Sequence, residues 1–231
     1  SGLHAAQTIE AAQAGRHVVT EKPMATRWSD GQAMVHACDQ AGVRLFVVKQ
    51  NRRNATIQLL KRAVEKHRFG QVYMVNVNVF WNRPQSYYDS APWRGTWEFD
   101  GGALMNQASH YVDLLDWLVG PVECVQAFTA TLARRIEVED TAVACLRFKN
   151  GALGVIQAAT SVHPGLPKTI AVHGDGGTVL VEQDDLIHWT FRNEDPRDNE
   201  VDEVVDRLRA VVEARGRKQD HRAGLVQRGE P

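Results

Sequence analysis

The chain of 231 residues is long enough to bury one large core or two small ones, and its 43% hydrophobic and 24% charged residues are typical of soluble globular proteins. A formal net charge of -1 gives no electrostatic case for a nucleic acid or an anionic membrane as a partner. No apolar run approaches the ~20 residues that span a bilayer, and three scattered cysteines without CxxC spacing favour free thiols in a reducing compartment, so a cytoplasmic location is expected.

The first 70 residues alternate between helical and β-branched patterns. The expected elements are, in order, a helix over 3–14, a strand over 17–20, a helix over 30–41, a strand over 44–49 and a helix over 55–67. Ser29 and Asn54 are the expected N-caps of the second and third helices. Strands that alternate with helices form parallel sheets with crossover connections, so residues 1–70 predict an α/β half-domain.

The pattern changes after residue 70. Residues 71–81 alternate apolar and polar side chains, as in a sheet that is covered on one face. Further strands are expected near 122–132, 138–148, 152–160, 169–173, 178–181 and 186–191. Asn150-Gly151 and the GDGG of residues 174–177 predict hairpin turns. Because this GDGG leads into a strand and not into a helix, it is not expected to hold phosphate.

The whole chain is therefore expected to combine three parts. Residues 1–70 form the α/β half-domain, and residues 71–192 form a mostly antiparallel open sheet domain of the α+β class with a central helix. Residues 193–231 are polar and charged, with one short helix near 204–212, and this tail is expected to be poorly ordered.

The central helix is predicted over the stretch DGGALMNQASHYVDLLDWLVG, residues 100–120. Two glycines open it and Gly120 closes it. Asn106 and His110 stand at i and i+4 and share one face, while the apolar residues that follow would hold the C-terminal half in the core. By itself such a histidine is more often structural than catalytic.

A second segment whose side chains could take part in chemistry is Glu21-Lys22-Pro23, which ends the first strand. Ligands of parallel α/β sheets bind beyond the carboxyl ends of the strands. If the central helix faces the same crevice, Lys22 and His110 would offer an ammonium and an imidazole to one small molecule. This pairing suits the oxidation of an alcohol, in which a base removes the hydroxyl proton as hydride leaves carbon.

These two segments resemble motifs of the glucose–fructose oxidoreductase, inositol dehydrogenase and MocA (Gfo/Idh/MocA) family of nicotinamide-dependent dehydrogenases. Members carry Glu-Lys-Pro after a Rossmann strand and a Gly-Gly helix in which a polar residue, often Asp and here Asn106, stands four before a histidine, here His110. The segments MNQASHYVDLL and WRGTWEFDGGA look most like the UDP-N-acetylglucosaminuronate 3-dehydrogenases, which serve the synthesis of bacterial surface polysaccharides. The resemblance covers residues 1–191 and implies that residues 1–70 are part of a Rossmann domain.

The resemblance implies NAD-dependent oxidation of a ring hydroxyl of a nucleotide-linked sugar, the 3-hydroxyl of UDP-N-acetylglucosaminuronate, with 2-oxoglutarate regenerating NAD+ in some members. The implied catalytic residues are Lys22, Asn106 and His110, with His110 as general base; which of Lys22 and His110 takes the proton first stays open. Desolvation and the nicotinamide cation should lower the pKa of Lys22. Because Asn106 is an amide, no carboxylate there raises the pKa of His110, which should stay mostly neutral near pH 7.

Position and residue type suggest further contacts. The expected cofactor-binding residues are His4, Glu21, Lys22, Pro23 and Arg52, and the expected substrate-binding residues are Tyr87, Trp93, Arg94 and Asn106. Arg94 could bind a carboxylate or a phosphate bidentately, or be solvated. Tyr87 and Trp93 could stack on a sugar or uracil ring, or pack the loop. Asp113 could orient His110 or lie exposed. No metal site is expected.

Two expectations concern the whole protein. The residues before Glu21 lack the strand and Gly-x-Gly-x-x-Gly turn that open a Rossmann dehydrogenase, so we expect a truncated member with negligible NAD affinity of its own. An open sheet with one apolar face needs a cover, which predicts a homo-oligomer formed through the sheet. The alternatives are a non-catalytic oligomerising fragment and a family dehydrogenase for another sugar or inositol.

Overall fold

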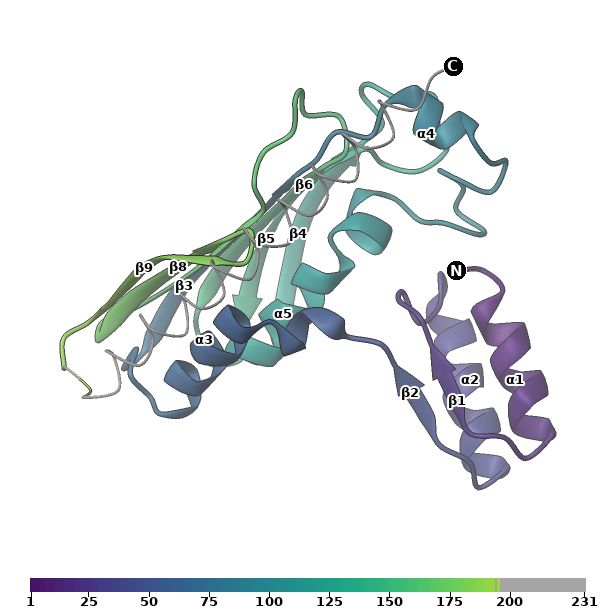
Figure 1. Ribbon diagram of the computed structural model, residues 1–231, viewed down its shortest axis with the longest axis horizontal. Helices are drawn as coiled ribbons and strands as arrows, with labels where there is room; N and C mark the ends of the chain where they lie inside the picture. The colour runs from purple at the N-terminus through teal and green to yellow at the C-terminus, as the bar shows by residue number, and fades with distance from the viewer. Residues whose placement is uncertain (194, 196–231) are drawn as a thin grey trace, which may run out of the picture.

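The computed structural model describes residues 1–193 and residue 195, which form a small N-terminal unit and a larger sheet unit (Figure 1). The elements of the N-terminal unit are α1 (His4–Gln13), β1 (Val18–Thr20), α2 (Trp28–Gln40) and β2 (Leu45–Val47). The two strands pair in parallel, with Val18 opposite Leu45 and Thr20 opposite Val47. This parallel pairing is the arrangement that the alternation of helices and strands predicts.

The sheet unit is built on an open sheet of seven strands within the described residues. Its strands are β3 (Val72–Phe80), β4 (Val122–Ala130), β5 (Thr141–Phe148), β6 (Leu153–Ala159), β7 (Thr169–Gly174), β8 (Gly177–Glu182) and β9 (Asp185–Phe191). Their order is β4-β5-β6-β3-β7-β8-β9, and every neighbouring pair is antiparallel except β3 and β6. The prediction of a mostly antiparallel open sheet is confirmed.

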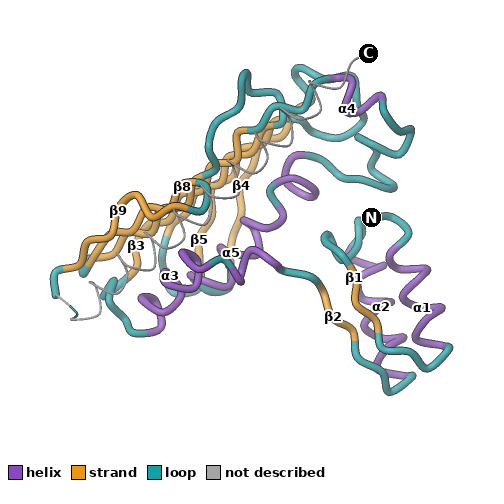
Figure 2. The backbone as a smooth tube through the Cα atoms, in the orientation of Figure 1, coloured by secondary structure: helices purple, strands orange, loops and turns teal. Residues whose placement is uncertain are grey.

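Helices cover one face of this sheet. The remaining elements are η1 (Gln50–Arg53), α3 (Ala55–Glu65), α4 (Gln85–Asp89), the π-helix η2 (Ala103–Gln107) and α5 (Ser109–Val119). α3 and α5 lie between the sheet and the N-terminal unit (Figure 1, Figure 2). In β5 the residues alternate, with Ala144 and Leu146 buried and Val143 and Cys145 exposed. The sheet therefore has one face in the core and one face toward solvent.

The core lies between α3, α5 and the sheet. Leu60 and Leu114, one from each helix, and Val75 and Ile170 from the strands are at most 1% exposed. Burying each such side chain stabilises the fold by roughly 1.5–3 kcal/mol. α5 is thus held firmly along its apolar face, and this fixes the position of the residues at its N-terminal end.

Local predictions differ from the structure at three places. The stretch of residues 100–120 is not one helix: η2 ends at Gln107, Ala108 has φ -90° and ψ 1°, and α5 begins at Ser109. Ser29 is not an N-cap, because α2 begins at Trp28 and has Arg27 before it. Asn54 does precede α3, but its Nδ2 donates to Asp184 Oδ1 instead of capping the helix.

The predicted poorly ordered tail of residues 193–231, with its short helix near 204–212, lies outside the described residues apart from 193 and 195. Within the described residues, each helix is too short or too polar to cross a bilayer.

Candidate active site

Lys22 follows the carboxyl end of β1 and contacts the residues just before α5. Its Nζ donates hydrogen bonds to the backbone oxygen of Asn106 at 2.7 Å and to Asn106 Oδ1 at 3.0 Å. The Nδ2 of Asn106 donates to Oδ1 of the buried Asp100, whose Oδ2 accepts the Gly95 N–H at 2.7 Å. The side chain of Asn106 therefore bonds two other side chains, Lys22 and Asp100. Ammonium, amide and carboxylate form one chain, and Asp100 fixes which end of the amide faces Lys22.

Burial and the neighbouring carboxylates act on the pKa of Lys22 in opposite directions. Burial lowers the pKa of Lys22 below its ordinary value, while the carboxylates of Asp100 and Glu21 act in the raising direction. The resulting shift has the direction that a lysine acting as proton donor or relay requires, because it brings the pKa closer to neutral pH.

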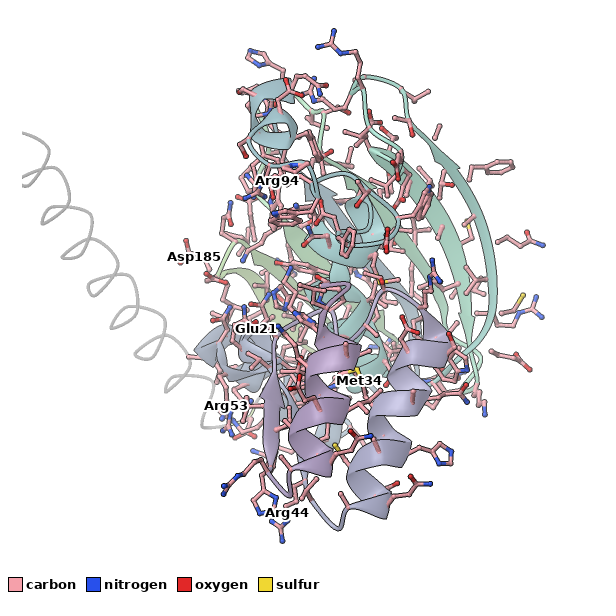
Figure 3. The ribbon with its side chains drawn as sticks, turned by 90° about the vertical axis from the view of Figure 1, so that its right-hand side faces the viewer. Glu21, Met34, Arg44, Arg53, Arg94 and Asp185 are labelled. Atoms are coloured by element: carbon pink, nitrogen blue, oxygen red, sulfur yellow. The ribbon has the colours of Figure 1, made fainter. Side chains whose placement is uncertain are left out.

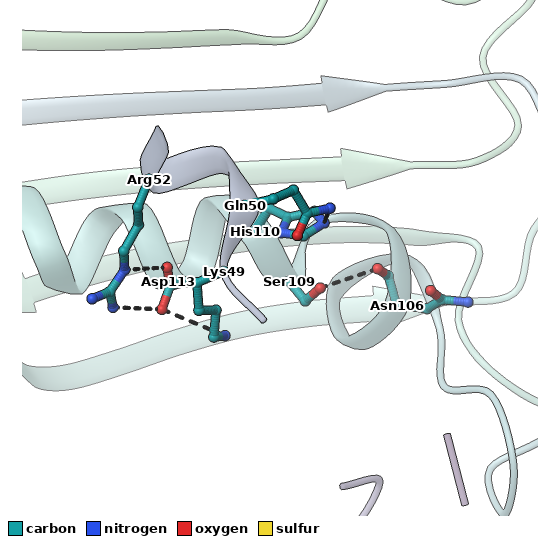
Figure 4. Close-up of polar contacts among 7 residues, drawn as sticks. All are labelled: Lys49, Gln50, Arg52, Asn106, Ser109, His110 and Asp113. Carbon is teal, nitrogen blue, oxygen red and sulfur yellow. Dashed lines mark hydrogen bonds and ion pairs between the residues drawn. The ribbon is translucent and has the colours of Figure 1, made fainter. Parts of the chain in front are cut away.

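His110 lies in the first turn of α5, four residues after Asn106. The Nε2 atoms of Gln50 and His110 are 3.2 Å apart, so the Gln50 amide donates to the imidazole in the tautomer that carries its proton on Nδ1 (Figure 4). Burial, and then the positive charges of Lys22 and Lys49, lower the pKa of His110 to about 4. The imidazole is therefore uncharged at neutral pH, as the sequence predicts. The main cause is burial and not the missing carboxylate at residue 106.

Asp113 lies one turn further along α5 and is paired with two cations. It accepts hydrogen bonds from Nε and NH2 of Arg52, both at 2.7 Å, and its Oδ1 is 3.4 Å from Nζ of Lys49 (Figure 4). Burial would raise the pKa of Asp113, but the Arg52 hydrogen bond and the charges of Lys49 and Arg52 hold it below its usual value. The structure gives Asp113 neither of its two expected roles, and it places the expected cofactor residue Arg52 in this ion pair.

A pocket of about 410 Å³ lies at the start of α1; its lining residues are Ser1, Leu3, His4, Gln7, Trp93 and Phe99. The Nδ1–H of His4 donates to the backbone oxygen of Pro23 at 2.9 Å. The side chain of Glu21 accepts the Lys22 N–H at 3.3 Å and is otherwise directed to solvent. His4 and Pro23 are thus joined to each other, and Trp93 brings the loop before η2 to the same pocket.

Of the expected substrate residues in that loop, Arg94 contacts the other two, Tyr87 and Trp93. The guanidinium of Arg94 lies 4.2 Å from the ring centroid of Tyr87 and 4.6 Å from that of Trp93. Figure 3 shows Arg94 above the N-terminal unit. The hydrogen bond from Gly95 to Asp100 joins this loop to the Lys22–Asn106 contact.

The sequence-based list of site residues omitted Gln50, Lys49 and Asp100. Gln50 and Lys49 directly follow the second parallel strand, at the same sheet edge as Glu21-Lys22-Pro23, so the rule that ligands bind beyond strand carboxyl ends could have found them. Asp100 carries no such signal: the sequence places it at a helix start, and only its burial shows that its charge serves the site.

Comparison with known proteins gives two family matches. Residues 1–49 match the oxidoreductase family with an NAD-binding Rossmann fold, and residues 57–180 match the GFO/IDH/MocA C-terminal domain. The chain is 27% identical over 209 residues to the levoglucosan dehydrogenase of Pseudarthrobacter phenanthrenivorans and 28% identical over 189 residues to the myo-inositol 2-dehydrogenase of Thermotoga maritima. These alignments cover 77% and 79% of the chain but 52% and 54% of the relatives, so the chain spans about half their length.

Two solved structures are more similar. The WlbA dehydrogenase of Bordetella pertussis, in complex with NADH and UDP-GlcNAcA, is 62% identical with a TM-score of 0.88 over 92% of this chain and 62% of its own. The WlbA dehydrogenase of Chromobacterium violaceum, in complex with the same two molecules, is 59% identical with a TM-score of 0.86 over 89% of this chain and 61% of its own.

Proposed function

This chain belongs to the Gfo/Idh/MocA oxidoreductase family, and from that membership we propose that it carries the catalytic residues of an NAD-dependent dehydrogenase that oxidises the 3-hydroxyl of UDP-N-acetylglucosaminuronate. The observation that carries this proposal is the convergence of Lys22, from the end of β1, with Asn106, one turn before the uncharged His110. The substrate is proposed because the WlbA dehydrogenase at 62% identity is a complex with NADH and UDP-GlcNAcA. The oxidised nucleotide sugar that this reaction forms would be used to build bacterial surface polysaccharides.

The residues near the end of β1 fit a nicotinamide cofactor. His4 lines a pocket together with Trp93 and bonds Pro23, the residue after Lys22, so polar donors and an aromatic ring meet near the sheet edge where dinucleotides bind. NAD, when bound, supplies the acceptor for the hydride that leaves carbon. We propose that His4, Lys22 and Pro23 hold the reactive end of the cofactor.

The chemistry of this chain then divides between two residues. The uncharged imidazole of His110 takes the proton of the substrate hydroxyl on Nε2, where the hydroxyl replaces the Gln50 amide as hydrogen-bond donor. The ammonium of Lys22 stabilises the negative charge that develops on the same oxygen, and it stays in place because Asn106 accepts two of its hydrogen bonds. Asn106 also stands where it can contact the substrate, and Tyr87, Trp93 and Arg94 are the proposed contacts on the loop side.

A second candidate function is assembly. On the solvent face of the sheet, Phe128 is 88% exposed and Val143, its neighbour across β4 and β5, is 42% exposed. Apolar side chains gathered on an open sheet face are typical of a subunit interface. We therefore propose a homo-oligomer formed through this face, either as part of the dehydrogenase or as the role of a non-catalytic module.

The dehydrogenase and the non-catalytic module are separated by following NADH formation at neutral pH with NAD+ and UDP-N-acetylglucosaminuronate. The assay uses this chain and a fusion that adds the part of the Bordetella WlbA dehydrogenase that the alignment does not span. Turnover by the fusion that falls roughly 100-fold or more in Lys22→Met and in His110→Asn supports the dehydrogenase. Turnover that neither variant changes contradicts it. Levoglucosan and myo-inositol serve as comparison substrates, and a preference for either would replace the nucleotide sugar with another family substrate.

A further inference from the structure

Two arginines of the loop before η2 share one aromatic ring. The guanidinium carbon of Arg83 lies 5.4 Å from the ring centroid of Tyr87, and that of Arg94 lies 4.2 Å from it. Each guanidinium also stacks on a tryptophan, Arg83 on Trp81 at 5.2 Å and Arg94 on Trp93 at 4.6 Å. The aromatic rings hold the two cations in place by cation–π contact and leave their N–H groups free for other partners.

These N–H groups lack partners in the described part of the chain. Both residues are partly buried, the Nε of each is fully buried without a hydrogen bond, and neither guanidinium has an ion pair or a hydrogen bond to any described residue. Nearby Arg134 differs, because its Nε donates to the Arg83 backbone oxygen at 2.7 Å and its NH2 donates to Asn82 Oδ1 at 3.2 Å. A buried Nε–H without a partner is costly, and two cations on one ring add repulsion, so this arrangement calls for an anion.

We propose that Arg83 and Arg94 together bind the diphosphate of the nucleotide-linked substrate. This inference rests on the proposed function, and it assigns the substrate group that the two arginines recognise. One guanidinium is enough to satisfy a carboxylate with two parallel hydrogen bonds, whereas two guanidiniums match the larger charge and the additional oxygens of a diphosphate. The ring of Tyr87 contacts both cations.

The position of this pair relative to the candidate active site is consistent with one extended ligand. Arg94 stacks on Trp93, and Trp93 lines the same pocket as His4. The residue after Arg94 donates its N–H to Asp100, which holds Asn106 against Lys22. A molecule with its sugar at Lys22 and its diphosphate at the arginine pair would therefore run along the loop of residues 82–100.

Binding of UDP and of uridine to the full chain tests this inference, with calorimetry for affinity and ³¹P resonances to report contact with the phosphates. Arg83→Gln and Arg94→Gln are each expected to weaken UDP binding roughly 10- to 100-fold and to leave uridine binding unchanged. Arg135→Gln is the matched control, because Arg135 is an exposed arginine of the same neighbourhood whose backbone N–H contacts Gln85, and it should change UDP affinity less than about 2-fold.

Arg83→Lys and Arg94→Lys keep the charge and guard against a variant that fails to fold; each should bind UDP more weakly than the unaltered chain and more tightly than the glutamine variant, because an ammonium cannot form the two parallel bonds. Unchanged UDP affinity in all four variants overturns the inference, as does a loss of glucuronate binding without a loss of UDP binding. Failure of the unaltered chain to bind UDP overturns it too. None of these results decides whether NADH is formed, so the proposed dehydrogenase activity is judged separately by the turnover assay.

Discussion

The buried carboxylate of Asp100 supplies a negative charge next to the Lys22–Asn106 contact. In the family pattern that charge often stands at residue 106 itself. Many family members have a carboxylate where this chain has Asn106, and here the carboxylate of Asp100 lies behind the amide and orients it. Asp100 acts on Lys22 in the direction that a carboxylate at residue 106 would, because it raises the pKa of Lys22 against the lowering effect of burial. An amide between the two charges also keeps the site from holding two adjacent carboxylates.

Replacing this carboxylate should change how Lys22 titrates. Asp100→Asn removes the charge that raises the pKa of Lys22, so that pKa should fall further, and the Asn106 amide becomes free to turn. In the active fusion we expect turnover to drop by up to about 100-fold and the basic limb of the pH–rate profile to move to lower pH. The double variant Asp100→Asn with Asn106→Asp returns one carboxylate to the group and should move the limb back. A basic limb that stays in place in the single variant contradicts this account.

The imidazole of His110 should titrate far below an ordinary histidine. Because its folded pKa is about 4 against an unfolded value of 6.5, the unfolded chain binds more protons between these values. The contribution of His110 to stability is therefore complete above pH 6.5 and is lost as the pH falls from 6.5 toward 4. NMR titration of the His110 ring measures this directly. Compared with the unaltered chain, His110→Gln should show a weaker decline of Tm over that range; a measured pKa near 6.5 would refute the burial argument.

The break between η2 and α5 is the element that the sequence pattern could not reveal. Apolar periodicity reads residues 100–120 as one helix, and it correctly locates α5 because Leu114 and Leu118 face the core. It misses η2 because side-chain hydrogen bonds that leave no periodic signal in the sequence set that turn. Glu139 accepts the Leu104 N–H at 3.0 Å, and Asp100 binds Asn106. The strands were predictable for the opposite reason: their alternation is local and follows from one buried and one exposed face.

A substitution at Gly102 should test how closely η2 is held. A Cβ at Gly102 would overlap the carboxylate of the buried Glu139, which binds the next turn of the chain. We expect Gly102→Ala to lower the free energy of unfolding by about 1–3 kcal/mol and to weaken the contact of Asn106 with Lys22. Gly31→Ala in α2 is the matched control, since the nearest atom to its Cβ is 4.0 Å away. That change should be neutral or stabilising by up to about 1 kcal/mol. Equal Tm changes in the two variants contradict the prediction.

The molecule as a whole presents one covered and one open sheet face, and the open face is where assembly is proposed. Sequence pattern predicts such a face from the alternation in the strands, but it does not tell which apolar residues gather on it. That information comes from the strand order, which brings Phe128 of β4 opposite Val143 of β5. Likewise, the sequence suggests Arg94 as a ligand residue, but only the folded loop shows that Arg83 contacts the same aromatic ring, that of Tyr87.

A charge placed on the open face should disrupt assembly. Phe128→Glu puts a carboxylate at a position that is 88% exposed in the single chain and would be buried in the proposed interface. Light scattering after gel filtration should give a mass above the 25.8 kDa of one chain for the unaltered protein and a mass near 25.8 kDa for the variant. Trp28→Glu, at an 82% exposed site on α2, should leave the mass unchanged. A monomer in all three samples rules out the proposed homo-oligomer.

The connection from β2 to α3 passes through η1, whose Gln50 contacts His110 and whose Arg52 binds Asp113, both on α5. This short crossing between the two units is therefore fastened to the helix that carries the imidazole. The end of β2 and the start of α5 thus share one set of side-chain contacts, so a substitution at Gln50 or Arg52 changes the surroundings of the imidazole without altering the helix that carries it.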